Sequence, residues 1–159
     1  MPTVLLHPFV AGLRPADQAP CWEGLHRVEV ETAVRVKHME CTTSAAYAMA
    51  LDALFGHGCD VVTVEHDIAV TPHQVMELEL CPDDFCAFDY RVSKHLCWSQ
   101  VKGSTGLGLA RVRVAAQSGI RALPRVPIVP WHDLASALGK RLPPVHLHYP
   151  IADHRHRYD

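Results

Sequence analysis

The segment that most constrains the fold is Asp60–Pro72, DVVTVEHDIAVTP, in which a run of valines ends at two carboxylates. A short apolar run rich in β-branched residues is typical of a buried strand. The preceding segment, Cys41–Gly58, places small and apolar residues at helical spacing behind a possible N-cap at Thr42, Thr43 or Ser44. A helix that leads into a buried strand predicts an α/β domain.

Weaker patterns predict the other elements. We expect strands over residues 3–10, 26–32, 34–38, 86–92 and 145–149. We expect helices over residues 71–80, with Pro72 in the first turn, and from about residue 131. Residues 12–20 contain two prolines and predict a loop, and a glycine-rich loop over 103–108 leads into a strand or a helix.

Composition limits the class of protein. At 159 residues and 48% hydrophobic content, the chain fits one domain with a substantial core. No run approaches the roughly 18 apolar residues of a membrane span, and the first ten residues lack the features of a signal peptide. The six cysteines form no C-x-x-C pair, which favours reduced thiols and a cytoplasmic location.

Charge is divided unevenly along the chain. Residues 1–90 hold 4 basic and 14 acidic residues, a balance of −10, whereas residues 91–159 hold 11 and 3, a balance of +8. Such asymmetry indicates either an anionic partner for the basic half or mutual attraction of the two halves across the fold.

The carboxylates after the valine run form the main candidate site. On an extended chain Glu65 and Asp67 point the same way, and His66 points the opposite way. Ligands of open α/β sheets bind at the carboxyl ends of strands. A pair of oxygen ligands there suits Mg²⁺ or Mn²⁺ together with the phosphates of a substrate. The alternative is an acidic strand end exposed to solvent.

The order of these features resembles the GT-A class of nucleotide-sugar glycosyltransferases, in which a helix leads into a D-V-V-x-x-D-x-D strand end followed by a proline. Glu65 stands where that family has its first aspartate, and TTSAAY stands where an Arg-Asn pair is often found. The matching residues are Tyr47, Ala50, Leu51, Gly58, Asp60, Val61, Val62, Glu65, Asp67 and Pro72.

Later segments extend the resemblance. PWHDLASALGKRL is similar to the W-x-E-D motif of inverting members, which implies that Asp133 is the catalytic base. GSTGLGLARVRV resembles a segment that lines the acceptor side, and HLHYP supplies His146 and His148 for the C-terminal histidine that binds the metal. The resemblance thus implies a donor side with Glu65, Asp67, Tyr47 and His7, and an acceptor side with Trp131, Gly106, Arg111 and Lys102.

The resemblance also implies an architecture and a reaction. We expect a truncated, single-domain GT-A fold, a Rossmann-like mixed sheet flanked by helices, with residues 1–72 as the donor and metal half and 73–159 as the acceptor half. The implied reaction moves a sugar from a nucleotide sugar, such as a UDP-sugar, to a hydroxyl with inversion, aided by Mn²⁺ or Mg²⁺. Small phage enzymes of this type and the basic second half make a hydroxymethyl-pyrimidine in DNA a candidate acceptor, reached in the host cytoplasm.

Two other classes fit parts of the sequence. A metal-dependent hydrolase of the phosphoesterase kind could use the tail residues His146, His148, Asp153, His154 and His156. A zinc-stabilised binding module without enzymatic activity could use Cys81, Cys86, His95 and Cys97.

Overall fold

The computed structural model describes residues 2–11, 15–91, 93, 95–97, 99–100, 106–117, 134, 137–138 and 141–154. Four candidate residues from the sequence lie outside these ranges, namely Lys102, Trp131, Asp133 and His156. So does most of the helix expected from about residue 131.

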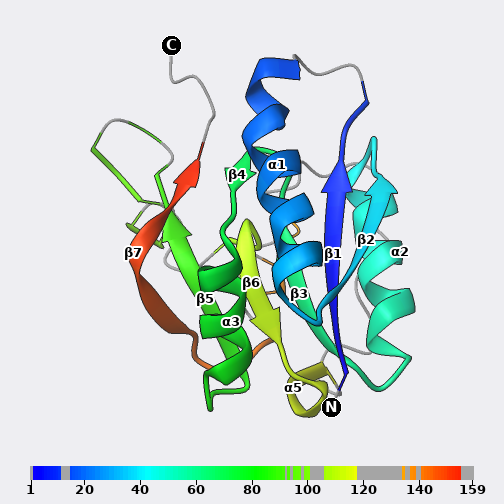
Figure 1. Cartoon of the computed structure of the whole chain (residues 1–159). Coiled ribbons are helices and arrows are strands. Elements are labelled where there is room, and N and C mark those ends of the chain that lie inside the picture. The colour runs from blue at the N-terminus through cyan, green and yellow to red at the C-terminus, as the bar shows by residue number, and fades with distance from the viewer. Residues whose placement is uncertain are drawn as a thin grey trace.

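The chain forms a seven-stranded sheet in the order β2-β1-β3-β6-β5-β7-β4 (Figure 1). The strands are β1 (Thr3–Phe9), β2 (Arg35–Glu40), β3 (Asp60–Val64), β4 (Ile68–Ala69), β5 (Phe85–Tyr90), β6 (Leu109–Val112) and β7 (His146–His154). The helices are α1 (Pro15–Glu31), α2 (Ser44–Phe55), α3 (Pro72–Leu80) and α5 (Val114–Gln117).

The sheet is mixed. β1 runs parallel to β2 and β3, whereas β6 is antiparallel to both of its neighbours, β3 and β5. β7 is parallel to β5, and the short β4 is antiparallel to the end of β7. The carboxyl ends of β1, β2, β3, β5 and β7 therefore meet at one edge, which we call the carboxyl edge; the opposite edge is the amino edge.

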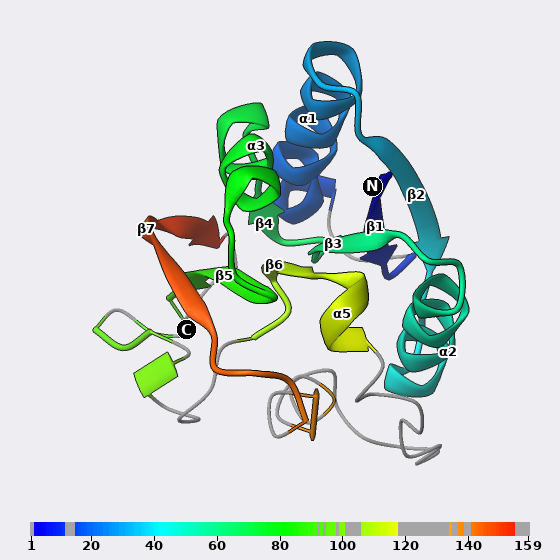
Figure 2. The same cartoon turned by 90° about the horizontal axis from the view of Figure 1, so that it is seen from below.

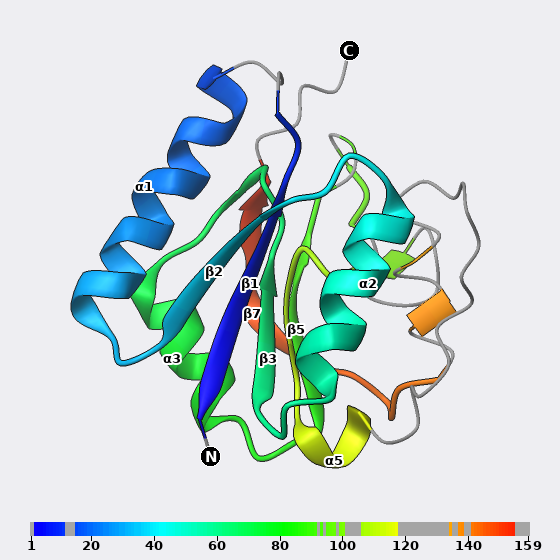
Figure 3. The ribbon, with the colours of Figure 1, turned by 90° about the vertical axis from the view of Figure 1, so that its right-hand side faces the viewer.

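Helices cover both faces of the sheet. α1 and α3 lie on one face, and α2 and α5 lie on the other (Figures 2 and 3). Val61 belongs to the apolar core on the α2 side, whereas Val62 belongs to the core on the α1 side. The valine run is therefore buried on both faces, and the predicted α/β mixed sheet flanked by helices is confirmed.

Two helices begin where their sequences predict. The Thr43 side chain accepts a hydrogen bond from the Ala46 amide at 3.1 Å and caps α2. Thr71 and Gln74 form a reciprocal capping box at the start of α3, with Pro72 directly after it. Each cap satisfies amides that have no partner within the helix.

The region between β1 and β2 differs from the prediction. Residues 12–20 were expected to be a loop and 26–32 a strand, but α1 runs from Pro15 to Glu31 with Pro20 inside it. The apolar positions follow helical spacing, because Cys21, Leu25 and Val28 are buried while Val30 is 71% exposed. The alternation of apolar and polar residues around Val28 and Val30 covers too few residues to distinguish a strand from a helix.

The last strand is also longer than predicted. β7 spans His146–His154 rather than five residues, and its second half pairs with β4. Among the described residues no helix has the length and apolar character needed to cross a membrane.

Candidate functional site

The candidate site lies at the carboxyl edge, where the chain leaves β3. Glu65 follows β3 directly, and its amide donates to the Gly108 carbonyl at 2.8 Å. The Ile68 amide donates to the Glu65 carbonyl at 3.0 Å, which closes a turn around His66 and Asp67. The two carboxylates are thus held on a short, hydrogen-bonded connection between β3 and β4.

Asp67 has a histidine partner from the far end of the chain. Its Oδ2 lies 2.9 Å from Nε2 of His154, and the two side chains are only 10% and 7% exposed. The contact follows from strand pairing, because Ile68 in β4 is aligned with His154 in β7. A buried carboxylate and an imidazole are therefore brought together across 87 residues of sequence.

Glu65 experiences both burial and a neighbouring charge. Burial is the larger cause and the Asp67 carboxylate the second, and together they raise the pKa of Glu65 to about 8. Two carboxylates that share a site cannot both ionise without cost, and a bound cation relieves that cost. Glu65 and Asp67 are therefore close enough to affect each other, and we call them the acidic pair.

Two tyrosines border the acidic pair. Burial raises the pKa of Tyr47 and of Tyr90, and the charge of Glu65 is the second cause for both. Asp67 acts on Tyr90 as well, and the Tyr90 ring centre lies 5.1 Å from that of His154. Tyr47, assigned to the donor side from the sequence, thus lies close to Glu65, whereas Tyr90 was not anticipated.

The glycine-rich segment closes this side of the site. A Cβ atom at Gly106 would lie 2.0 Å from the Tyr90 hydroxyl oxygen, and one at Gly108 would lie 2.6 Å from the Tyr90 ring. Thr63 also donates to the Leu107 carbonyl at 2.6 Å. The expected residue Gly106 is therefore at the site, and its lack of a side chain makes room for Tyr90.

A cluster of aromatic rings lies on the β1 and β2 side of the carboxylates. His7 is fully buried, and its Nδ1 is 3.0 Å from Nδ1 of His38. Trp22 stacks on His38 with ring centres 4.6 Å apart and meets His7 edge-on at 4.7 Å. Burial first, then His38 and His66, lower the pKa of His7 to about 3, so its ring is neutral at physiological pH.

Cys21 joins the aromatic cluster to the acidic pair. Its Sγ lies 3.6 Å from Nε2 of His7 and donates to the Glu65 carbonyl at 3.4 Å. Burial and the charge of Asp67 raise the pKa of the Cys21 thiol to about 12. A thiol with this pKa is a neutral packing group rather than a nucleophile.

The structure does not place His146 and His148 beside the acidic pair. They align with Cys86 and Phe88 in β5, and their ligand atoms group with those of Cys81, Cys86 and Asp83. The pairing of β4 with β7 brings His154 to Asp67 instead. The sequence does show a histidine-rich tail, but strand register alone decides which histidine reaches the carboxylates.

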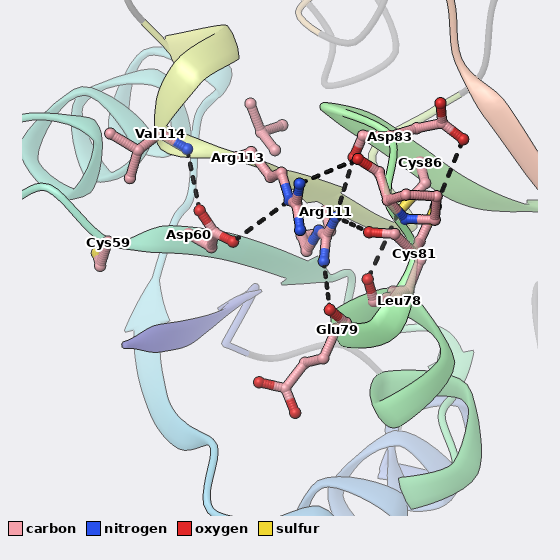
Figure 4. A network of polar contacts seen from close by, with 12 residues as sticks. Cys59, Asp60, Leu78, Glu79, Cys81, Asp83, Cys86, Arg111, Arg113 and Val114 are labelled. Carbon is pink, nitrogen blue, oxygen red and sulfur yellow. Dashed lines mark hydrogen bonds and ion pairs between the residues drawn. The ribbon is translucent and has the colours of Figure 1, made fainter. Parts of the chain in front are cut away.

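The acceptor-side role expected for Arg111 is also corrected. Its guanidinium is buried at the amino edge and donates to the carbonyls of Glu79 at 2.7 Å, Cys81 at 2.7 Å and Asp83 at 2.9 Å (Figure 4). These bonds tie the end of α3 and the start of β5 to β6. Arg111 therefore holds the fold together and does not reach the carboxyl edge.

Asp67, His154 and Glu65 offer two carboxylates and one imidazole, a set of ligands that suits Mn²⁺ or Mg²⁺. The groups whose ligand atoms all lie within 4.8 Å of one another, among the residues that the structure describes, do not include these three. Asp67 and His154, 2.9 Å apart, could contact an ion directly, whereas Glu65 could join only through water or after a rotamer change.

Fold and site together define an α/β protein with a buried aspartate, a half-buried glutamate and a histidine at the carboxyl edge of its sheet. Comparison with protein-family models gave no match, and comparisons with curated proteins and with solved structures gave none either.

Proposed function

We propose that the protein is a metal-dependent glycosyltransferase that moves a sugar from a nucleotide-sugar donor to an acceptor hydroxyl. One observation carries the proposal: Glu65 and Asp67 emerge together at the carboxyl end of β3, and β7 adds His154 to Asp67. The carboxyl ends of strands are where α/β proteins bind phosphorylated ligands.

Each residue of the proposed site has a role that follows from its position. A bound Mn²⁺ or Mg²⁺ would neutralise charge on the leaving diphosphate. Asp67 and His154 would hold the ion, and Glu65 would lose its proton when it contributes its carboxylate. By its resemblance to the base of inverting enzymes, Asp133 would accept the proton of the acceptor hydroxyl.

The aromatic cluster suits the donor nucleotide. Trp22 is 37% exposed and lies next to the carboxyl ends of β1 and β2. A partly exposed indole offers a face on which a nucleobase can stack. His7, assigned to the donor side from the sequence, is too buried to touch a ligand and would act by holding His38 and Trp22 in place.

A thermal-shift screen tests the proposal. Nucleoside diphosphates and UDP-sugars should raise the melting temperature only when Mn²⁺ or Mg²⁺ is present. Asp67→Asn should abolish this dependence, whereas Asp52→Asn, an exposed change on α2, should leave it intact. A diphosphate that binds equally well without the ion would contradict the proposal.

The acceptor requires a separate assay. We propose DNA that contains a hydroxymethyl-pyrimidine, on the basis of the +8 balance of residues 91–159. Sugar transfer to such DNA should weaken steeply with salt, because phosphate contacts release counterions. Transfer to a small neutral hydroxyl compound at the same rate would remove DNA from the proposal.

The Asp67–His154 pair also favours a second candidate, a metal-dependent hydrolase, because the same ligand types hold hydrolytic metal centres. The two functions differ in their need for an acceptor. A transferase releases nucleoside diphosphate faster when acceptor is added, whereas a phosphoesterase cleaves its substrate at a rate that the acceptor does not change.

A further inference from the structure

A second group of metal-ligating side chains lies at the amino edge of the sheet, away from the acidic pair. Cys81 ends α3, Cys86 lies in β5 and His148 lies in β7. All three are buried, at 4%, 0% and 8% exposure, and their ligand atoms lie within 4.8 Å of one another. We call them the thiol group.

His148 is oriented as metal-binding histidines are. Its Nδ1 lies 2.8 Å from the Glu77 carboxylate, which fixes the ring and leaves Nε2 to bind a ligand. That Nε2 is buried and has no hydrogen-bond partner among the described residues. A histidine whose other nitrogen is bonded to a carboxylate is the usual arrangement around zinc.

Charge at this edge favours thiolates once a cation is present. The buried guanidinium of Arg111 is bonded to three neutral carbonyls, and Figure 4 shows it beside Cys81 and Cys86. Burial raises the pKa of the Cys86 thiol to about 12, while Arg111 acts in the opposite direction. A Cys86 thiol with this pKa is neutral without a metal, and a bound divalent cation would displace its proton.

Further ligands border the thiol group on its exposed side. Cys81 also belongs to a group with Asp83 and His146, whose ligand atoms lie within 4.8 Å of one another. Asp83 and His146 contact each other at 2.8 Å and are 49% and 50% exposed. A surface hollow lined by His73, Met76, Glu77, Leu80 and Cys81 gives an entry path from solvent.

We infer that the thiol group is a zinc site, with Cys81, Cys86 and His148 as ligands and the fourth position supplied by the Asp83–His146 pair. Two sulfurs and an imidazole select zinc over the hard cations expected at the acidic pair. A tetrahedral zinc ion with Zn–S bonds of about 2.3 Å and Zn–N bonds of about 2.0 Å holds its ligands about 3.5–3.8 Å apart. The side chains thus need to converge only slightly.

The site joins three elements that are separate in sequence. It links the end of α3 to neighbouring strands β5 and β7, close to the bonds that Arg111 makes. Of the four residues weighed for a zinc module from the sequence, the structure groups Cys81 and Cys86, and the third ligand is His148 rather than His95 or Cys97. We expect a structural role, in which zinc stabilises the amino edge.

Cobalt titration of the reduced full-length chain tests the inference. One equivalent of Co²⁺ should produce thiolate-to-cobalt charge-transfer absorption, and zinc should displace the cobalt and raise the melting temperature. Cys86→Ser should weaken binding at least 100-fold and remove most of that absorption. Cys59→Ser, which changes a buried free cysteine directly before β3, should leave it unchanged.

Two further variants separate ligation from folding. His148→Gln keeps both sulfurs, so it should keep charge-transfer absorption but weaken binding 10- to 100-fold, and Glu77→Gln should weaken it about 10-fold. The titration of the unaltered chain does not depend on any variant folding. Absence of charge-transfer absorption in that chain, or its full retention in Cys86→Ser, would overturn the zinc assignment.

Discussion

The two edges of the sheet differ in the ligands that they offer, although one strand serves both. At the carboxyl edge β7 presents His154 to Asp67, and at the amino edge it presents His148 near Cys81 and Cys86. Oxygen ligands favour Mg²⁺ or Mn²⁺, and sulfur ligands favour zinc. The strand supplies imidazoles to both ends, so the residues opposite them decide which cation each end can select.

The edges also differ in how they balance charge. At the carboxyl edge two acidic groups lie together, and the pKa of Glu65 rises in response. At the amino edge the buried charge is the Arg111 guanidinium, and its hydrogen bonds go to neutral carbonyls. A bound cation would reduce the repulsion between the two carboxylates of the acidic pair, whereas thiolates at the amino edge would offset the positive charge of Arg111.

The largest effect that we expect is from Asp67→Asn. Loss of the carboxylate charge weakens the contact to His154 and replaces an anionic metal ligand with a neutral amide, so Mn²⁺-dependent nucleotide binding and any transfer activity should fall at least about 100-fold. Isothermal titration calorimetry with Mn²⁺ and UDP measures the loss of binding.

The same variant also tests whether the two edges are independent. Cobalt binding by Asp67→Asn should equal that of the parent chain. Loss of cobalt charge-transfer absorption in this variant would show that the edges share one site or one folding unit.

Arg111→Leu should produce the next largest effect, on stability rather than binding. It leaves three carbonyls without this donor, that of Cys81 buried and those of Glu79 and Asp83 partly buried, and an unpaired buried group costs about 1–3 kcal/mol. We expect the free energy of unfolding to fall by about 3 kcal/mol or more in urea denaturation. Arg113→Leu is the matched control, because Arg113 is more exposed, makes one 3.0 Å bond to the Pro82 carbonyl and otherwise has a 4.0 Å ion pair with Asp60.

The Arg111 variant also separates its structural role from the acceptor role first expected for it. A stable Arg111→Leu chain that lost only sugar transfer would restore the acceptor assignment. A chain that unfolds in less urea and still binds Mn²⁺ and UDP below its transition supports the structural role.

Two titrating groups, His7 and Glu65, should change stability with pH in opposite directions. His7 has its pKa lowered from 6.5 to about 3, so the unfolded chain binds more protons between these values and stability falls as pH drops through them. Glu65 has its pKa raised from 4.5 to about 8, so stability falls as pH rises through that range. These contributions cancel between about pH 4.5 and 6.5.

Glu65→Gln should reveal the increase in stability with pH that the titration of His7 causes. With the Glu65 titration removed, stability should rise by about 2 kcal/mol from pH 5 to 6.5, at about 1.4 kcal/mol per pH unit for one group. The loss between pH 6.5 and 8 should disappear. Urea unfolding at several pH values measures both changes, and an unaltered profile in the variant would contradict the assignment to Glu65.

The sequence predicted best what depends on local pattern. The valine strand, the capped helices α2 and α3, and the acidic pair followed from periodicity, caps and strand-end position. The region of α1 was wrongly predicted as a loop and a strand. Which of its apolar residues are buried depends on the sheet face that the helix covers, and the local sequence does not show that face. Helix and strand patterns overlap in so short a window.

Partners across the sheet could not be read from the sequence. His154 meets Asp67 because β4 pairs with β7 in one register, and a shift would present a different residue. Arg111 was assigned to the acceptor side, yet it lies in the interior and donates to backbone carbonyls. Sequence predicts residue types at strand ends, whereas register decides which of them come into contact.

The smallest effect that we expect is from Gly106→Ala. The new Cβ would meet the Tyr90 hydroxyl oxygen at 2.0 Å, so the ring must move, at about 1–2 kcal/mol for an overpacked site. Tyr90→Phe removes that oxygen and should recover part of the loss in the double variant. Gly56→Ala is the matched control, because φ there is −73° and the nearest atoms lie 3.8 Å away, so stability should hold or rise slightly.

Since Tyr90 borders Asp67 and His154, Gly106→Ala should also weaken Mn²⁺ binding while cobalt binding at the thiol group stays constant. Equal weakening at both edges would mean that the variant loosens the whole sheet, and the contrast between the edges would then fail.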